Sequence, residues 1–106
     1  MGSQIMTIHV KAQIMWAKKQ VRSGTWIAVC DALGLTIEAE NEAELQSMIE
    51  ETQHFLFLDL FEDGALDRFL RERGWTTTAP IPASSPESGV RFDVPFELRP
   101  WSPANV

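Results

Sequence analysis

Carboxylates are the commonest side chains in this sequence that are able to do chemistry, with fifteen Asp and Glu residues against nine Lys and Arg residues. A two-metal nuclease needs several carboxylates converging on metal ions about 4 Å apart. Asp31 ends an expected strand, Glu38 lies on the next strand and Glu51 lies on an expected helix. Glu38 alternates with apolar Ile37 and Ala39, so it is expected to face solvent. A solvated acidic surface is therefore favoured over a metal-dependent nuclease.

The remaining reactive side chains form no catalytic pattern. His9 and His54 are far apart in the sequence and lack the spacing of a metal motif. Cys30 is the single cysteine, so it cannot form an internal disulfide, and Asp31 beside it should raise its pKa. We interpret Cys30 as a packed structural residue. The sequence contains no phosphate-binding loop and no nucleophile-elbow motif. We therefore expect no catalytic residues, no metal and no cofactor.

Size and charge limit the class of protein. With 106 residues and 12.0 kDa, the chain is expected to form a single domain over 1–106, and its 44% hydrophobic residues supply a core. The formal net charge of -6 opposes direct binding to nucleic acid and suits a basic partner. No apolar run approaches the ~20 residues that cross a bilayer, and no secretory signal is visible. A single cysteine favours a reducing compartment, so we expect a cytoplasmic protein. Residues 1–6 are interpreted as a tag or a disordered start.

Period-two alternation predicts the strands. One strand is expected over 8–14, followed by a polar hairpin connection over 17–24 and a second strand over 25–30. A turn at 31–34 ending in Gly34 leads to a third strand over 35–39, which completes an antiparallel meander. The clearest alternation, over 90–98, predicts a fourth strand, and Pro95 within it indicates a sheet edge or a bulge.

Helical signals lie between these strands. Asn41 is a suitable N-cap with Glu44 at N3, and the helix should run to about Phe61 or Glu62. Asp63 is expected to cap a second short helix, which Gly74 ends. Residues 76–89 are interpreted as a flexible linker and 99–106 as a tail. The element order β-β-β-α-α-β predicts an α+β two-layer sandwich, with one long and one short helix packed on one face of the sheet.

Aromatic side chains exceed what one helix face needs for its own core. Phe57 and Phe61, or Phe55 and Leu58, must point away from the inward stripe of the long helix. They are either covered by the short helix, Trp75 and the last strand, or exposed as a subunit or partner interface. Trp101, among prolines in the tail, either docks on another subunit or packs over its own sheet. The candidate interface residues are Phe55, Phe57, Leu58, Phe61, Trp75 and Trp101.

The run from Trp26 to Glu50 resembles the HicB-like antitoxin domain, most closely an uncharacterised branch allied to HicB. The resemblance is carried by four elements in order: a hydrophobic-aromatic strand, an acidic turn, a short strand and a capped helix with an acidic first turn. These elements are Trp26-Ile27-Ala28-Val29, Asp31-Ala32-Leu33-Gly34, Thr36 to Glu40, and Asn41-Glu42-Ala43-Glu44-Leu45.

The resemblance implies a partial ribonuclease-H-like fold without catalytic carboxylates. It also implies a role in covering a small basic mRNA-cleaving toxin, and oligomerisation. This sequence has Cys30 where the family usually has proline and Ala39 where glycine is common. Its C-terminus lacks the family's DNA-binding pattern, so direct nucleic acid binding is not implied.

We therefore expect a non-enzymatic interaction domain, part of a toxin-antitoxin system, that binds a basic protein partner and forms a homodimer. The acidic surface, the edge strands at 8–15 or 90–98, and the helix face at Phe57 and Phe61 offer contacts. One alternative is a homodimeric structural or ligand-binding module with a pocket between the helix and the 76–89 linker, lined by Trp75 and Phe92. The other alternative is the metal-dependent nuclease that uses Asp31, Glu38 and Glu51.

Overall fold

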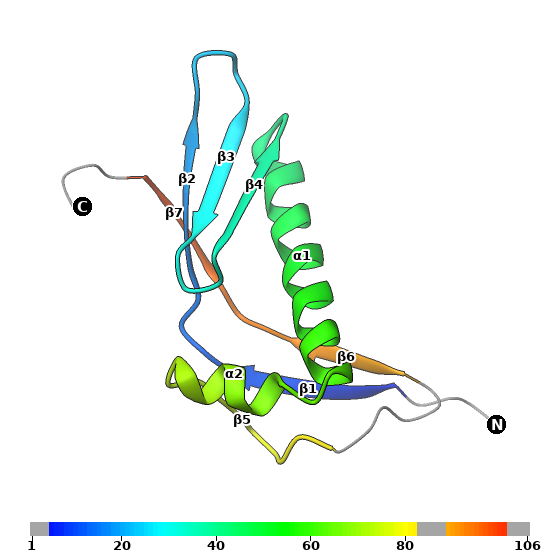
Figure 1. Ribbon diagram of the computed structural model, residues 1–106. Coiled ribbons are helices and arrows are strands. Elements are labelled where there is room, and N and C mark those ends of the chain that lie inside the picture. Colours follow the sequence, from blue (N-terminus) through cyan, green and yellow to red (C-terminus); the bar gives the residue numbers. More distant parts are fainter. Residues whose placement is uncertain (1–4, 83–88, 102–106) are drawn as a thin grey trace. The chain divides into compact units, whose positions relative to one another are not determined.

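The computed structural model describes residues 5–82 and 89–101, and it has the predicted α+β architecture. The strands form two mixed sheets, one of three strands in the order β5-β1-β6 and one of four strands in the order β4-β3-β2-β7 (Figure 1). Two helices follow the fourth strand: α1, Glu42–Glu62, and α2, Leu66–Glu72. Residue contacts divide the chain into two compact units.

Unit 1 contains residues up to Ala12 together with Thr52–Pro95. Its sheet places β1, Met6–Lys11, between β5, Thr76–Thr77, and β6, Val90–Asp93. β1 pairs antiparallel with β5 and parallel with β6, where His9 lies opposite Asp93 and their side chains are 2.8 Å apart. The buried side chains of these strands, the second half of α1 and α2 form the core of this unit, which includes Ile8, Val10, Phe57, Phe61, Leu66, Leu70 and Phe92.

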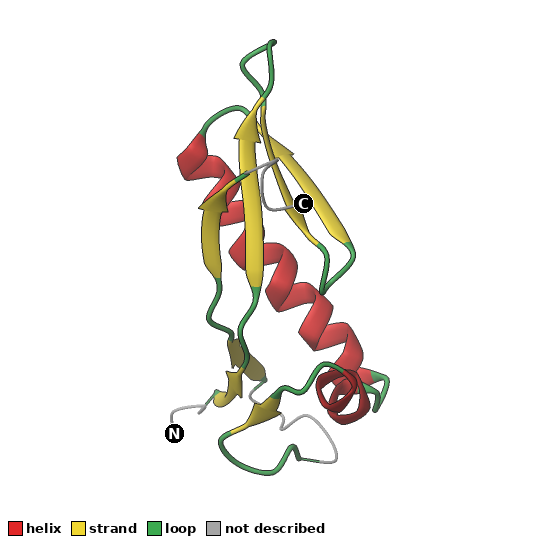
Figure 2. Cartoon of the chain, turned by 90° about the vertical axis from the view of Figure 1, so that its left-hand side faces the viewer, coloured by secondary structure: helices red, strands yellow, loops and turns green. Residues whose placement is uncertain are grey.

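Unit 2 contains Gln13–Glu51 and the residues from Phe96 onward. β2, Met15–Gln20, β3, Trp26–Cys30, and β4, Leu35–Ala39, form an antiparallel meander. Its second and third strands were expected, but its first strand is 15–20 and not 8–14. β7, Glu97–Pro100, adds parallel to β2 at the edge of the sheet. The first turns of α1 lie against one face of this sheet (Figure 2). The core of this unit includes Ile14, Trp16, Ala28, Cys30, Ile37, Ala39, Leu45 and Ile49.

Two predictions of continuous strands are wrong. The strand expected over 8–14 ends at Lys11 in β1, and the next strand, β2, begins at Met15 in the other sheet. Burial alternates without a break through Ile8, Val10, Ile14 and Trp16, so period two gives no sign of the interruption. The strand expected over 90–98 is divided into β6 and β7. Pro95 lies in this gap, consistent with its inability to donate to a ladder.

The edges of the sheets follow from these divisions. β6 and β7 are edge strands, as Pro95 indicated, but segment 8–15 is not an edge. β1 lies between β5 and β6, and β2 lies between β3 and β7. The polar residues 17–20, expected in a loop, belong to β2, because pairing with β3 satisfies their backbone.

The local signals for turns and helix ends are mostly confirmed. Gly34 has φ of 67° and closes the predicted turn with a 3.2 Å hydrogen bond from its N–H to the Asp31 carbonyl. The Glu44 N–H donates to Asn41 Oδ1 over 2.8 Å, which confirms the N-cap of α1. Gly74, with φ of 74°, follows the end of α2 as predicted. Asp63 is not the cap of α2, because Ala65 occupies that position without a side-chain hydrogen bond.

The expected linker over 76–89 is only partly irregular. Thr76–Thr77 forms β5 against β1, and the Thr78 N–H donates to the His9 carbonyl over 3.1 Å. Residues 83–88 of this linker, and residues 102–106 of the expected tail, lie outside the described residues. Residues 99 and 100, expected in the tail, belong to β7.

Phe57 is the side chain on which the core of unit 1 most depends. It is fully buried, with ring centroids 6.1 Å from Phe69 and 6.2 Å from Phe92. Replacing Phe57 by Ala should lower the free energy of unfolding by about 3–5 kcal/mol, because burial and packing are both lost. Urea unfolding followed by circular dichroism measures this change. Phe55→Ala, at a position 54% exposed on the same helix, is the control, and an equal loss in both variants would contradict the assignment.

Candidate functional site

The six candidate interface residues are not equally accessible. Phe57 and Phe61 are buried within unit 1, so they are covered internally and do not present a surface anchor. Leu58 and Trp75 are half-buried. Phe55 and Trp101 are exposed, at 54% and 41%. Trp101 belongs to unit 2 and the other five residues belong to unit 1, so the candidates are divided between the two units.

Phe92 was one of the two residues predicted to line a ligand pocket between the long helix and the 76–89 linker. Its ring lies 6.0 Å from His54, 6.2 Å from Phe57 and 6.0 Å from Phe61, measured between centroids. The Phe92 side chain is 7% exposed. Phe92 therefore belongs to the aromatic core of unit 1, and Trp75 is half-buried. The pocket beside the 76–89 linker stays a prediction, because residues 83–88 lie outside the described residues.

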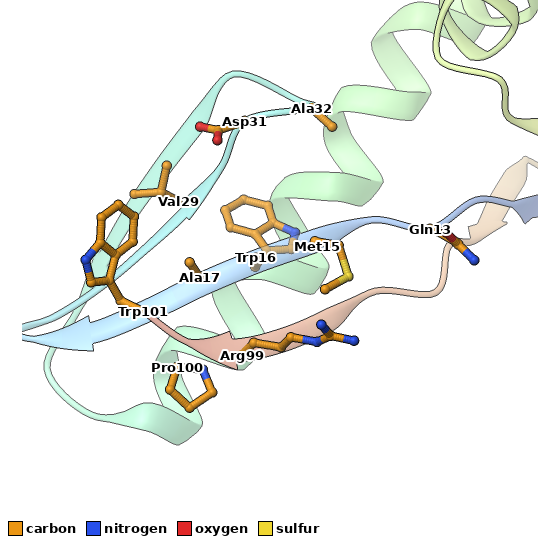
Figure 3. A pocket seen from close by; sticks show the side chains of 10 residues that line it. All are labelled: Gln13, Met15, Trp16, Ala17, Val29, Asp31, Ala32, Arg99, Pro100 and Trp101. Atoms are coloured by element: carbon orange, nitrogen blue, oxygen red, sulfur yellow. The ribbon is translucent and has the colours of Figure 1, made fainter. Parts of the chain in front are cut away.

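A pocket of about 510 Å³ lies in unit 2, among β2, β3 and β7 (Figure 3). Met15, Ala17, Val29 and Trp101 supply apolar lining, and Asp31 and Arg99 supply charge. Its volume lies within the range of small-ligand sites. Of these residues, the sequence had indicated Trp101 as a candidate interface residue and Asp31 as a candidate nuclease carboxylate. The uninterrupted apolar run of β3, Trp26–Cys30, was the signal for Val29, because it places apolar side chains on both faces of the sheet.

Two cationic side chains near this pocket, Arg99 and Lys19, each have a nearby partner. Arg99 Nη2 lies 2.7 Å from Glu97 Oε2, so this pair on β7 is electrically neutral. Lys19 Nζ lies 5.6 Å from the centre of the Trp101 ring, within the range of a cation–π contact. The Trp101 N–H donates to the Lys18 carbonyl over 2.7 Å. Trp101 therefore extends β7 along β2 and is positioned by backbone as well as by its ring.

Helix α1 carries the net charge of the protein. Six of its residues are acidic and none is Lys or Arg. The nine acidic residues elsewhere balance the nine basic residues, so the net charge of -6 equals that of α1. All six carboxylate residues are exposed: Glu42, Glu44, Glu50, Glu51, Asp59 and Glu62. Among the described residues, Lys18 is the one cation in an ion pair with this helix, at 2.6 Å from Glu42.

The second half of α1 combines this charge with an exposed ring. Phe55 lies one turn from Glu51 and one turn from Asp59, so the three share one side of the helix. The last turn contains no basic residue, although the helix dipole favours cations there. Asp59 and Glu62 therefore lie where intrahelical electrostatics oppose them. The arrangement suits contact with a cationic, partly apolar surface.

The carboxylates proposed for a nuclease do not gather. Asp31, Glu38 and Glu51 are each exposed. Over residues 5–82 and 89–101, no three His, Cys, Asp or Glu side chains lie close enough together to hold a metal ion.

Comparisons with known proteins add no assignment. A scan against protein-family models found no match, and searches of the curated proteins and of the solved structures found none. Within the described segments, no helix is both long enough and apolar enough to cross a membrane.

Cys30 is a packed thiol, as predicted. Its side chain is fully buried at the end of β3. Burial is the main cause that raises its pKa, and the neighbouring Asp31 carboxylate raises it further. Hydrogen bonds with the Leu33 and Ala32 backbone act in the opposite direction. The sequence had indicated Asp31 as the cause, but desolvation is the larger effect.

The raised pKa predicts how stability depends on pH. The folded state holds the thiol proton more tightly than the unfolded state, so this contribution to stability is complete below pH 9.0, the ordinary thiol pKa. It is lost as the pH rises through the higher folded-state pKa. Urea unfolding between neutral pH and pH 10.5 should therefore show a loss of stability that Cys30→Ala reduces. An identical pH dependence in both proteins would contradict this account.

Proposed function

We propose that this protein is a non-enzymatic interaction protein that binds a basic protein partner through the exposed side of α1. The observation that carries the proposal is the concentration of the net charge on one helix beside the exposed Phe55 ring. Electrostatic attraction of this kind raises association rates and selects partners, whereas a buried ring supplies binding energy.

The sequence resemblance to HicB-like antitoxins also supports this proposal. An antitoxin acts by covering a small basic toxin, and an anionic helix with an apolar anchor suits that task. We propose a cytoplasmic location for such a pair, in line with the single buried thiol.

The carboxylates in the last turn of α1 lower the stability of the folded protein, and this supports a binding role for them. Carboxylates near a helix C-terminus lower stability by about 0.3–1 kcal/mol each when exposed, because they face the negative end of the dipole. Asp59 and Glu62 have no ion pair with another described residue to offset that cost. Ion pairs with a cationic partner would offset this loss of stability.

The test uses affinity capture from a lysate of the source organism, with the captured proteins identified by mass spectrometry. A basic protein should be retained in stoichiometric amount by the wild type and released as salt rises. Asp59→Lys and Phe55→Ala should each reduce its retention by about tenfold or more, since one reverses a central charge and the other removes the ring.

Two matched variants control this experiment. Asp67→Lys makes the same change on the exposed side of α2, and Ile5→Ala removes an equally exposed apolar side chain. Both should retain the partner at the wild-type level. Retention that is equal in all five proteins, or a captured partner that is acidic, would rule out the α1 surface.

A further inference from the structure

The outward face of the four-stranded sheet in unit 2 is apolar at its centre. Along β2 and β3, Trp16, Ala28 and Cys30 point inward and are buried. The positions between them point to the opposite face, which in a half-solvated antiparallel sheet is ordinarily polar. Here that face has Ala17, Ile27 and Val29 at its centre, with Met15 and Trp101 beside them at 38% and 41% exposure.

Charges of opposite sign flank this apolar centre in one row. Lys19 on β2 lies opposite Ile27 on β3, and Ile27 lies opposite Glu38 on β4. Lys19 and Glu38 are therefore two strands apart, about 10 Å at the backbone, and Ile27 lies between them. Neither side chain has an ion pair with another described residue.

This pattern is complementary to itself. If a second copy faces the sheet through a two-fold axis that runs along β3, the β2 side of one copy lies over the β4 side of the other. Ile27 and Val29 then meet their own counterparts on the axis. Lys19 of each copy meets Glu38 of the other, which gives two equivalent ion pairs. The next row places Ala17 over Thr36 in the same way.

We infer that the outward face of the β4-β3-β2-β7 sheet is the interface of a homodimer, with β3 on the two-fold axis and Lys19 paired with Glu38 of the second copy. Closed two-fold dimers use one self-complementary patch on each subunit, and this face has that property. Face-to-face sheets pack about 10 Å apart with their strands nearly aligned, a spacing that both charged side chains can bridge. The α1 surface is not part of this face, so the inference stands independently of the proposed partner.

Charge-reversal substitutions at Lys19 and Glu38 test the inference. In a dimer of Lys19→Glu chains, both ion pairs become Glu–Glu contacts, and in a dimer of Glu38→Lys chains both become Lys–Lys contacts. Each variant should raise the dissociation constant of the dimer roughly 10- to 100-fold. A mixture of the two variants should recover dimers, because every contact across the mixed interface is then Glu–Lys. The double variant Lys19→Glu/Glu38→Lys should dimerise by itself.

Size-exclusion chromatography with light scattering over a concentration series measures these masses, and circular dichroism verifies that each variant is folded. Lys11→Glu, the same change at an exposed site in unit 1, should leave the wild-type dimer intact. A wild type that stays at 12.0 kDa at every concentration would overturn the inference. So would a dimer whose dissociation constant is the same in Lys19→Glu, Glu38→Lys and the wild type, because another surface must then hold it. Loss of the basic partner in the capture experiment would leave these masses unchanged, so the two proposals fail separately.

Discussion

The meander β2-β3-β4, closed on one side by the first half of α1, is the arrangement on which both candidate surfaces depend. Small, fully buried residues of β3, Ala28 at its centre and Cys30 at its end, accompany the buried Leu45 and Ile49 of the helix. Because strand side chains alternate between faces, burying this set commits Ala17, Ile27 and Val29 to the other face. Because one side of α1 is buried, its carboxylates must lie on the outer side.

The distribution of charge separates the two surfaces by chemistry. The helix concentrates negative charge around one exposed ring, which suits a partner of opposite charge. The outward sheet face instead carries one basic and one acidic position on either side of an apolar centre, which suits a second copy of itself. A surface whose charges all have one sign repels a second copy of itself, whereas a surface with equal numbers of positive and negative charges does not. The two kinds of contact are therefore compatible within one small chain.

Unit 1 buries most of its aromatic residues in its own core. The Phe92 ring lies among His54, Phe57 and Phe61, and the Arg73 guanidinium stacks 3.6 Å from the centre of the Phe69 ring. This cluster accounts for much of the aromatic surplus that the sequence displayed. In unit 1 the ring that remains exposed is Phe55. The sequence showed its spacing from two carboxylates but not its exposure.

Short-range features were determined by the sequence alone. The cap at Asn41, the turn at Gly34, the end of α2 at Gly74 and the extent of α1 each depend on residues within a few positions of one another, so local patterns identify them. The meander of three strands was likewise expected, with its first strand displaced. The acidic composition of α1 was also visible, since it needs no knowledge of contacts.

Tertiary structure alone decided the rest. Whether residues 8–20 form one strand or two, which sheet each joins, and the parallel pairing with residues 90–100 depend on contacts more than 80 positions apart. Alternation is the same for either choice of partner, so no local signal distinguishes them. The burial of Phe57 and Phe61 and the pocket beside Trp101 follow from those pairings, because segments distant in sequence are neighbours in space. The row of Lys19, Ile27 and Glu38 follows from the register of the meander.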